Sequence, residues 1–393
     1  MMEQLRTAVI GYGNMGTAHA ACLAEGRIDG MRLTAVCDTN PSRLETARRR
    51  HPGVACHEHM DSLLDSGCAD AVIVAVPHPL HAELAMMALR RGLHVLVEKP
   101  VDISVTRAEA LNRAAAESGR VFGVMFNQRT NPLFRRAREI VQGGELGELK
   151  RTTWIITNWY RTQRYYDSGA WRATWAGEGG GVLLNQAPHQ LDLWQWICGM
   201  PMEVAAWCQT ARYHHIEVED DAVIMTRYAN GATGQFITTT GEYPGTNRLE
   251  IAGDRGKLVL ENGLIRWWRL REPECEVRFQ SEEGFAHIPF DVEEIAPQEP
   301  ETAHAGILRN FAGAILRGET LIAPGAEAIR ELTLSNAAYL SQWQGNRPVA
   351  VPFDGALFDR LLAEHAASSV YRPERREADP DGSYHERWQV KWN

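Results

Sequence analysis

The chain has 393 residues, of which 44% are hydrophobic and 23% are charged, and its formal net charge is −9 at pH 7. These values are ordinary for a globular protein, and the length suffices for two domains with separate cores. The acidic balance argues against nucleic acid and against an anionic membrane surface as partners, because both attract basic faces.

Two absences in the sequence bear on the cellular location. No N-terminal run resembles a signal peptide, and no apolar run is long enough to span a bilayer. The seven cysteines are an odd number without a Cys-x-x-Cys pair, and several lie in apolar runs. We therefore expect a cytoplasmic protein with reduced cysteines.

The N-terminal segment predicts a dinucleotide-binding unit. A β-rich run from Leu5 to Ile10 ends at Gly11-Tyr-Gly-Asn-Met-Gly16, and helical sequence follows from Thr17 to Ala24. In this context the glycines let the backbone approach a pyrophosphate, whose charge meets the helix N-terminus.

The acid after the next strand bears on the choice of cofactor. The apolar run Leu33 to Cys37 ends in Asp38, where a carboxylate accepts the ribose hydroxyls and repels a 2′-phosphate. The sequence therefore favours NAD. Arg43, which could host a phosphate, keeps NADP as the alternative.

Helices and apolar strands continue to alternate, which predicts a doubly wound parallel sheet. They are Pro41 to His51, Val54 to His57, Ala71 to Val76, Ala82 to Arg91 and His94 to Pro100. The turn Pro77 to His81 should lie at the carboxyl edge of the sheet, where ligands bind. His78 and His81 either touch the cofactor or cap the turn and the next helix. Lys99 is either a solvated lysine at a strand end or an ammonium that stabilises a developing alkoxide.

A second domain should begin near residue 126. Phe134 to Val141 predicts a helix, and Leu149 to Asn158 is β-rich. Tyr160 to Trp175 is dense in aromatic and arginine residues. This composition suits either a loop that closes over a polyhydroxylated ligand or a packed surface loop.

The stretch from Gly179 to Gly199 is the central candidate for a catalytic element. Because a proline is tolerated only in the first turn of a helix, Pro188 predicts a helix that begins near Asn185. At about 100° per residue, Asn185, His189 and Asp192 share one face, while apolar residues on the other face predict burial. These three side chains could reach one small ligand, or they could form the ordinary polar side of a capped helix.

The rest of the second domain predicts an antiparallel sheet, because short strand-like runs follow one another without helices. They are Val204 to Gln209, Val218 to Tyr228, Thr233 to Thr240, Arg248 to Ala252, Lys257 to Leu260 and Leu264 to Arg269. Arg271 to Pro300 is expected to be a loop or edge strand, and helical periodicity returns at Glu301 to Leu316 and Ala326 to Gln342. Two His-rich stretches, Cys56 to His59 and His214-His215, lack further ligands, so we predict no metal.

Together these motifs resemble the Gfo/Idh/MocA oxidoreductases, in which they occur in the same order. The resemblance also covers Val124 to Arg129, Gly143 to Gly147 and the region from Glu301 to about Pro352. It implies an α/β protein with an N-terminal Rossmann NAD-binding domain, residues 1–125, and a C-terminal α+β domain, residues 126–365, with a large, mostly antiparallel open sheet. One sheet face would pack on helices and the other would pair subunits as a homodimer or homotetramer, with Trp267-Trp268 fitting such an interface. Residues 366–393 would form a tail.

The resemblance extends to individual residues of the site. Lys99, His189 and Asn185 are the expected catalytic residues. The expected substrate contacts are Lys99, Arg129, Tyr160, Asn185, His189 and Asp192, the last either as a contact or as structural support. The expected cofactor contacts are Gly11, Tyr12, Gly13, Asn14, Met15, Gly16, Asp38, Arg43, Val76, Pro77, His78, His81, Glu98, Lys99, Asn127, Trp171 and Arg172.

The resemblance implies an NAD-dependent dehydrogenase of a sugar, sugar derivative or cyclitol, in the branch that includes oxidation of the pyranose 3-hydroxyl. His189, with an ordinary pKa near ~6.5, suits the base for the hydroxyl proton, and Lys99 polarises the same hydroxyl. Much of the family has an aspartate at the position of Asn185. An asparagine cannot titrate, so here it should orient the hydroxyl.

Two other functions stay open at this point. Some relatives retain NAD and oxidise one carbon transiently to eliminate a glycosidic substituent, without net redox. A non-catalytic NAD-sensing regulator is the other alternative, which the joint presence of Lys99 and His189 disfavours.

Overall fold

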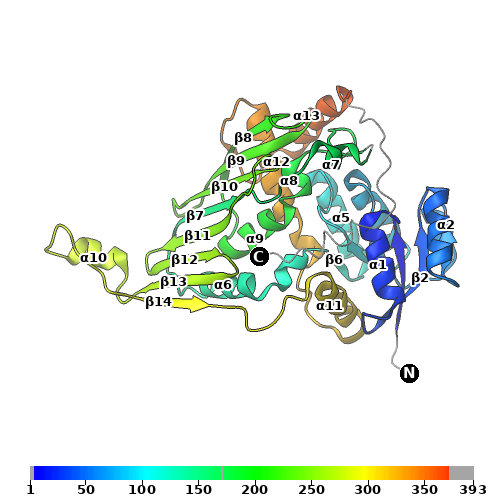
Figure 1. Ribbon diagram of the computed structural model, residues 1–393, viewed down its shortest axis with the longest axis horizontal. Coiled ribbons are helices and arrows are strands. Elements are labelled where there is room, and N and C mark those ends of the chain that lie inside the picture. The colour runs from blue at the N-terminus through cyan, green and yellow to red at the C-terminus, as the bar shows by residue number, and fades with distance from the viewer. Residues whose placement is uncertain (1–3, 170, 371–393) are drawn as a thin grey trace.

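The computed structural model describes residues 4–169 and 171–370, so most of the expected tail lies outside the described residues. The chain forms two sheets that lie beside each other along the long axis of the molecule (Figure 1). Among the described residues, no helix has the length and apolar character needed to cross a bilayer.

The first sheet has six parallel strands in the order β3-β2-β1-β4-β5-β6. Its strands are β1 (Leu5–Ile10), β2 (Met31–Cys37), β3 (Ala55–His57), β4 (Ala71–Val74), β5 (His94–Val97) and β6 (Phe122–Val124). Every residue of β4 is buried, as expected for a central parallel strand covered on both faces. This is the doubly wound sheet that the alternation of strands and helices predicts.

Five α-helices accompany this sheet. They are α1 (Asn14–Ala24), α2 (Pro41–Arg50), α3 (Met60–Asp65), α4 (His81–Arg90) and α5 (Val105–Ser118), with a 3₁₀ turn η1 (His78–Leu80) before α4. The start of α2 shows why the chain folds here: the Asn40 side chain accepts from the N–H of Ser42, and Pro41 occupies the first turn.

The second sheet has nine strands in the order β14-β13-β12-β11-β7-β10-β9-β8-β15. They are β7 (Leu149–Ile156), β8 (Glu203–Thr210), β9 (Glu219–Arg227), β10 (Thr233–Thr239), β11 (Asn247–Gly253), β12 (Gly256–Glu261), β13 (Leu264–Leu270), β14 (Phe290–Ile295) and β15 (Val349–Ala350). All neighbouring strands are antiparallel except β10 and β7. The mostly antiparallel open sheet is therefore present.

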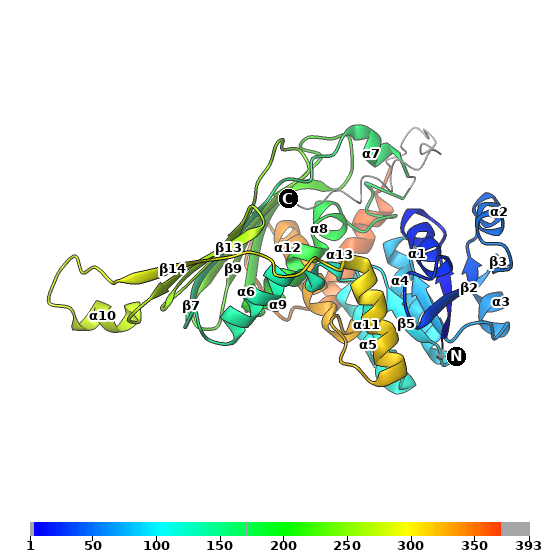
Figure 2. The same cartoon turned by 60° about the horizontal axis from the view of Figure 1, so that its bottom comes forward.

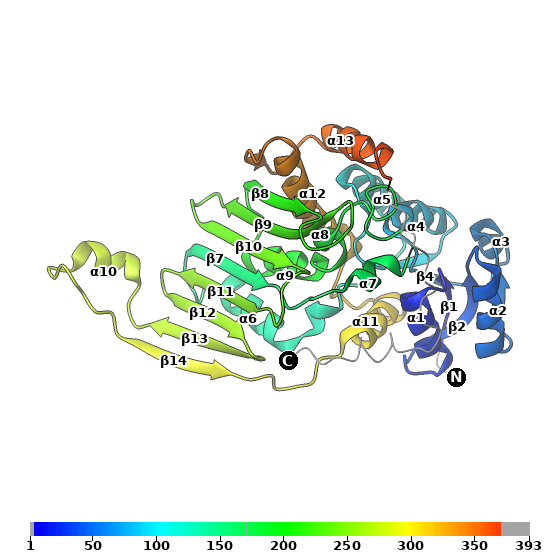
Figure 3. The same ribbon diagram turned by 45° about the horizontal axis from the view of Figure 1, so that its top comes forward.

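Helices cover the face of the second sheet that looks toward the first, while no described helix covers the other face (Figure 2). The remaining helical elements are α6 (Pro132–Gln142), α7 (Gln163–Asp167), α8 (Val182–Asn185), α9 (Pro188–Cys198), α10 (Glu274–Gln280), α11 (Ala303–Arg317), α12 (Ile329–Trp343), α13 (Gly355–Ala367) and the 3₁₀ turns η2 (Asn127–Thr130) and η3 (Gly325–Glu327). The α10 segment projects beyond the sheet with β13 and β14 (Figure 3).

The two neighbouring tryptophans of β13 lie on opposite faces of the sheet, because successive side chains of a strand alternate. Trp267 is 1% exposed and belongs to the core. Trp268 is only partly buried, and the Lys257 ammonium lies 4.7 Å from its ring centroid. The expectation that both face a subunit interface is therefore wrong for Trp267.

A buried ion pair joins η2 to α9. Arg129 Nε and Nη2 donate to the two carboxylate oxygens of Asp192 at 2.8 and 2.7 Å, and Nη1 donates to Glu327 of η3 at 2.7 Å. Both side chains of the Arg129–Asp192 pair are 1% exposed. Burial raises the pKa of Asp192, and the guanidinium of Arg129 opposes that shift. The pair therefore depends on both partners being present.

We predict that Arg129→Met destabilises the fold by about 3 to 5 kcal/mol, because it leaves an uncompensated carboxylate in the core. Denaturant unfolding measures the loss. The matched control is Arg271→Met, which breaks the exposed Arg271–Asp291 pair and should leave the unfolding midpoint unchanged. Equal effects of the two variants would contradict a structural role for Arg129.

Candidate functional site

The site lies where the carboxyl edge of the first sheet meets the turn between α8 and α9. Lys99 follows β5, and its Nζ donates to the backbone oxygen of Asn185, the last residue of α8, at 2.6 Å. Desolvation lowers the pKa of Lys99, and the Glu98 carboxylate opposes the shift. The structure thus brings two of the three expected catalytic residues into contact.

The helix that carries His189 begins later than the sequence predicts. The chain forms α8, leaves helical geometry at Gln186 and Ala187, and begins α9 at Pro188, because a proline is best accommodated in the first turn. His189 therefore lies in the first turn of α9. Desolvation lowers its pKa well below 6.5, and the nearby Lys99 charge adds to the shift. A neutral imidazole at neutral pH follows.

The Asn185 amide is held at both ends. Its Nδ2 donates to Glu178 Oε1, and its Oδ1 accepts from the Tyr165 hydroxyl at 3.2 Å. Arg172 Nη1 donates to the same hydroxyl at 2.8 Å. Sequence reasoning missed Tyr165 and Glu178 as members of the site, although the aromatic loop and the acid before the glycine run were visible.

Two histidines, His19 and His304, act on Glu98, the residue before Lys99. The Glu98 carboxylate lies 2.7 Å from His19 Nε2, and burial of this acid is outweighed by the contact with His19, so its pKa falls to about 2. Burial lowers the pKa of His304 to about 4. Asn127 Nδ2 lies 3.3 Å from His304 Nδ1. Neither His19 nor His304 carries a sequence signal that we recognised.

Three buried polar atoms near Lys99 have no hydrogen-bond partner among the described residues. They are Asn127 Oδ1, Gln186 Oε1 and His189 Nδ1. Buried polar groups are rarely left unpaired in proteins, so such atoms are places where a ligand group or water can bind. Two of these residues, Asn127 and His189, are among those expected to contact the cofactor or the substrate.

The glycine loop has the shape that a dinucleotide needs. Gly11 has φ +89°, and a Cβ on Gly16 would lie 1.7 Å from the oxygen of Gly11, so neither position accommodates a side chain. A Cβ on Gly13 would instead meet nothing closer than Arg43 Nη1 at 4.0 Å. Gly13 is also the N-cap of α1 and makes no side-chain cap, which leaves first-turn amides, including those of Asn14 and Met15, for an anion.

Asp38 lies at the end of β2 beside the glycine loop. Its carboxylate accepts from the N–H groups of Tyr12 at 2.7 Å and Asn40 at 2.8 Å, and Arg43 Nη1 lies 3.4 Å away. The Tyr12 side chain points away to His51, with Oη 3.0 Å from Nε2. Any contact of Tyr12 with a cofactor would therefore come from its backbone.

The two loops after β4 and β5 are tied together by a histidine. His81 Nε2 lies 2.8 Å from the oxygen of Val76, next to Pro77, and Nδ1 lies 2.7 Å from the oxygen of Pro100. His81 is 1% exposed, and desolvation lowers its pKa. This geometry favours the alternative in which His81 holds the turn rather than touching a ligand.

The aromatic loop reaches the first domain through Trp171. Its ring packs edge-on against His78, with centroids 5.3 Å apart, and the Arg172 guanidinium lies 4.6 Å from the Trp171 ring centroid. His78 Nδ1 lies 3.3 Å from the oxygen of Glu178. Trp171 and Arg172 are therefore placed between the loop after β4 and the turn that carries Asn185.

Three residues that the sequence predicts as substrate contacts have other surroundings in the structure. Arg129 and Asp192 satisfy each other in the buried ion pair, so of the two roles left open for Asp192 the geometry favours structural support. Tyr160 is 48% exposed, and its described ring contact is with Tyr243. Tyr165, five residues later in the same loop, reaches Asn185 instead.

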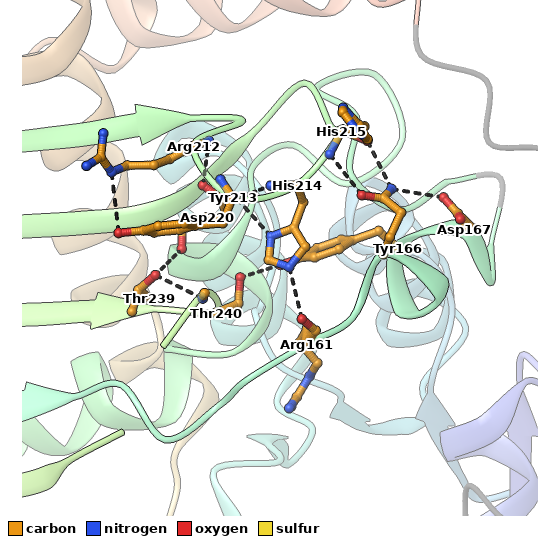
Figure 4. A network of polar contacts seen from close by, with 12 residues as sticks. Arg161, Tyr166, Asp167, Arg212, Tyr213, His214, His215, Asp220, Thr239 and Thr240 are labelled. Atoms are coloured by element: carbon orange, nitrogen blue, oxygen red, sulfur yellow. Dashed lines mark hydrogen bonds and ion pairs between the residues drawn. The ribbon is translucent and has the colours of Figure 1, made fainter. Parts of the chain in front are cut away.

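A second polar network holds the loop that carries Tyr165. His214 Nδ1 lies 2.8 Å from the Asp220 carboxylate, and its Nε2 lies 2.9 Å from the oxygen of Arg161 (Figure 4). Desolvation opposes ionisation of His214, but the hydrogen bond to Asp220 raises its pKa. The Tyr166 ring packs 4.8 Å from the His214 ring.

Within residues 4–169 and 171–370, no group of three His, Cys, Asp or Glu side chains could hold a metal ion.

Comparison with known proteins identifies the class. Residues 5–126 match the model of the oxidoreductase family with an NAD-binding Rossmann fold, and residues 134–259 match the Gfo/Idh/MocA C-terminal domain. The chain belongs to the Gfo/Idh/MocA family of oxidoreductases. The family, the fold class and NAD as cofactor, all predicted from the sequence, are confirmed.

Individual relatives share most of the length of the chain. Inositol 2-dehydrogenase of Rhizobium meliloti is 23% identical over 86% of this chain and 96% of that protein. The NAD(+)-dependent scyllo-inositol 2-dehydrogenase of Bacillus subtilis is 25% identical over 86% of this chain and 94% of its own length. The crystal structure of the WlbA dehydrogenase from Bordetella pertussis, in complex with NADH and UDP-GlcNAcA, is 27% identical with a TM-score of 0.76, covering 90% of this chain and 99% of that one.

We predict that Gly13→Ala weakens cofactor binding without affecting stability, whereas Gly16→Ala destabilises the fold. Gly13→Ala should keep the melting temperature but raise the Kd for NADH by about tenfold or more, because its methyl group enters the space open to the pyrophosphate. Gly16→Ala should lower the melting temperature, because its Cβ would collide with the backbone of Gly11. Fluorescence titration and thermal unfolding measure the two effects. A Gly13→Ala protein that binds NADH normally would refute this assignment of the loop.

Asp38→Asn should relax the preference for NADH over NADPH. The variant keeps an acceptor for the Tyr12 N–H but removes the negative charge, and Arg43 beside it then favours a 2′-phosphate. The ratio of the two Kd values reports the change. An unchanged ratio would place the selectivity elsewhere in the chain.

Proposed function

We propose that this protein oxidises a secondary hydroxyl of a sugar, sugar derivative or cyclitol with NAD. The observation that carries the proposal is the contact of Lys99 with the backbone oxygen of Asn185, one turn before His189. The effect of the Lys99 charge on the pKa of His189 supports it. Relatives named for inositol and a structural relative holding UDP-GlcNAcA, all rich in hydroxyls, support this substrate class.

Each residue has a distinct task in the proposed reaction. Bound NAD supplies the hydride acceptor. His189 is neutral and accepts the hydroxyl proton, while the Lys99 ammonium donates toward the same oxygen and stabilises the alkoxide that forms. Asn185 holds Lys99 through its backbone oxygen and offers its side-chain oxygen, shared with Tyr165, for orienting the hydroxyl. The base and the cation thereby act on one oxygen from two elements.

Subunit pairing and location complete the proposal. The uncovered face of the nine-stranded sheet would pair copies of the chain as a homodimer or homotetramer, because a large uncovered sheet face is unusual for a monomer. A hollow on this face is lined by both apolar and charged side chains, including Ile155, Met225, Arg248 and Glu250. All seven cysteines are free, in keeping with a reducing cytoplasm.

Lys99→Ala and His189→Ala should each reduce kcat by about a hundredfold or more, while the Kd for NADH changes little. The matched control is His287→Ala, which alters an exposed histidine. In the wild type, the depressed pKa of His189 should keep kcat/KM for oxidation level as the pH falls through 6.5, the ordinary pKa of histidine, because the base stays neutral there. Near-normal turnover in either variant would reject that residue's role.

Incubation with NAD and a panel of inositols, sugars, glycosides and sugar nucleotides tests the reaction itself. We expect NADH to appear in step with a keto product. Product without net NADH would instead establish cleavage through a transient ketone. Absence of turnover across the panel, with NADH still bound, would refute the proposed function.

A further inference from the structure

The carboxylate that contacts Asn185 comes from Glu178. Glu178 lies in the turn before the glycine run that leads to α8, and it is 2% exposed. Its Oε1 accepts from Asn185 Nδ2, and its Oε2 accepts from the N–H of Ala173 at 2.6 Å. A buried acid therefore contacts the residue at which this chain departs from the aspartate common in its family.

Several groups around Glu178 favour its charged form against the effect of burial. Arg172 Nη1 lies 4.0 Å from Oε1. Burial raises the pKa of Glu178, while Arg172, the Ala173 N–H, Asn185 and Lys99 all oppose the shift. Ala173 has φ 60°, in the left-handed region that alanine seldom adopts, and its N–H is the group that Glu178 holds. The Glu178 carboxylate thus stabilises the backbone conformation of this turn.

We propose that Glu178 is a positioning residue of the catalytic site, where its carboxylate contacts Asn185 and takes the place of a carboxylate at residue 185. It acts through Asn185, whose amide it orients, and through Lys99, whose positive charge it stabilises. This inference rests on the proposed function, because it assigns the charge of the same site.

The physical reason is that an amide has a donor end and an acceptor end. With Nδ2 fixed by the carboxylate, Oδ1 faces the Tyr165 hydroxyl. Without the carboxylate the amide can turn over, and a donor would then face Tyr165 and the substrate hydroxyl. A small error in such positioning costs about a hundredfold in rate.

Three variants test the proposal: Glu178→Gln, Asn185→Asp, and the double variant that moves the carboxylate to residue 185. Glu178→Gln should lower kcat by about a hundredfold with little change in KM or in the Kd for NADH. The double variant should recover at least about tenfold of that loss, because the charge returns to the same place. Asn185→Asp alone places two carboxylates together and should shift the pH profile of kcat/KM.

A second measurement needs no substrate. The chain has four lysines, so NMR of lysine-labelled protein can follow Lys99, assigned with Lys99→Ala. The charged and titratable groups around Lys99 are Glu98, Glu178, Glu331, Arg172, His78, His81, His189 and His304. The pKa of Lys99 should fall further below its ordinary value in Glu178→Gln, because one of the carboxylates that oppose the shift is lost, and it should return in the double variant.

The outcomes separate the proposal from its alternatives. If Glu178 only holds the turn, Glu178→Gln will lower the melting temperature and NADH affinity, the pKa of Lys99 will not return in the double variant, and activity will not be rescued; this result overturns the proposal. If the wild type turns over no substrate of the panel, the proposed function fails. The NMR titration then still decides whether a carboxylate at position 178, or one moved to position 185, helps to stabilise the positive charge of Lys99.

Discussion

The hydrogen bond from Lys99 Nζ to the backbone oxygen of Asn185 is the contact on which the rest of the site depends. It joins residues 86 positions apart, one at the carboxyl end of β5 and the other at the last residue of α8. The donor belongs to the nucleotide-binding sheet and the acceptor to the part that covers the second sheet. The other residues of the site lie around Asn185: Tyr165 and Glu178 contact its side chain, and His189 follows it in the first turn of α9.

The second constraint is charge balance inside the protein, where the low dielectric constant strengthens both attraction and repulsion between charges. Glu98 stays ionised because His19 lies against it, while burial keeps His304 and His189 neutral. An ammonium and a neutral imidazole can therefore coexist a short distance apart. Desolvation lowers the pKa of both groups, but the ordinary pKa of lysine lies far above that of histidine, and the Glu98 carboxylate opposes the shift at Lys99. One site can therefore provide both an acid and a base.

The fold was largely predictable because its signals are local. Apolar runs such as Ala71–Val74 indicate buried parallel strands, and the turn chemistry between hairpins indicates the antiparallel sheet. The helix Val105–Ser118 is absent from the sequence predictions, although its alanine, arginine and glutamate content favours a helix. The predicted start of α9 is three residues early, because the break at Gln186 and Ala187 follows from packing rather than from a local breaker.

The sequence predicted most of the strands, the glycine loop, the acid at Asp38 and the residue types at 99, 185 and 189, because each depends on neighbours within a few positions. It did not predict the short strands β6 and β15, and helix α10 lies in a region expected to be a loop or edge strand. The tertiary structure alone decided which polar groups meet. Arg129 forms a buried ion pair with Asp192, 63 residues away, and the carboxylate that contacts Asn185 comes from Glu178. Periodicity cannot reveal such pairs, because they form only when separate segments are buried together and each buried charge requires a partner.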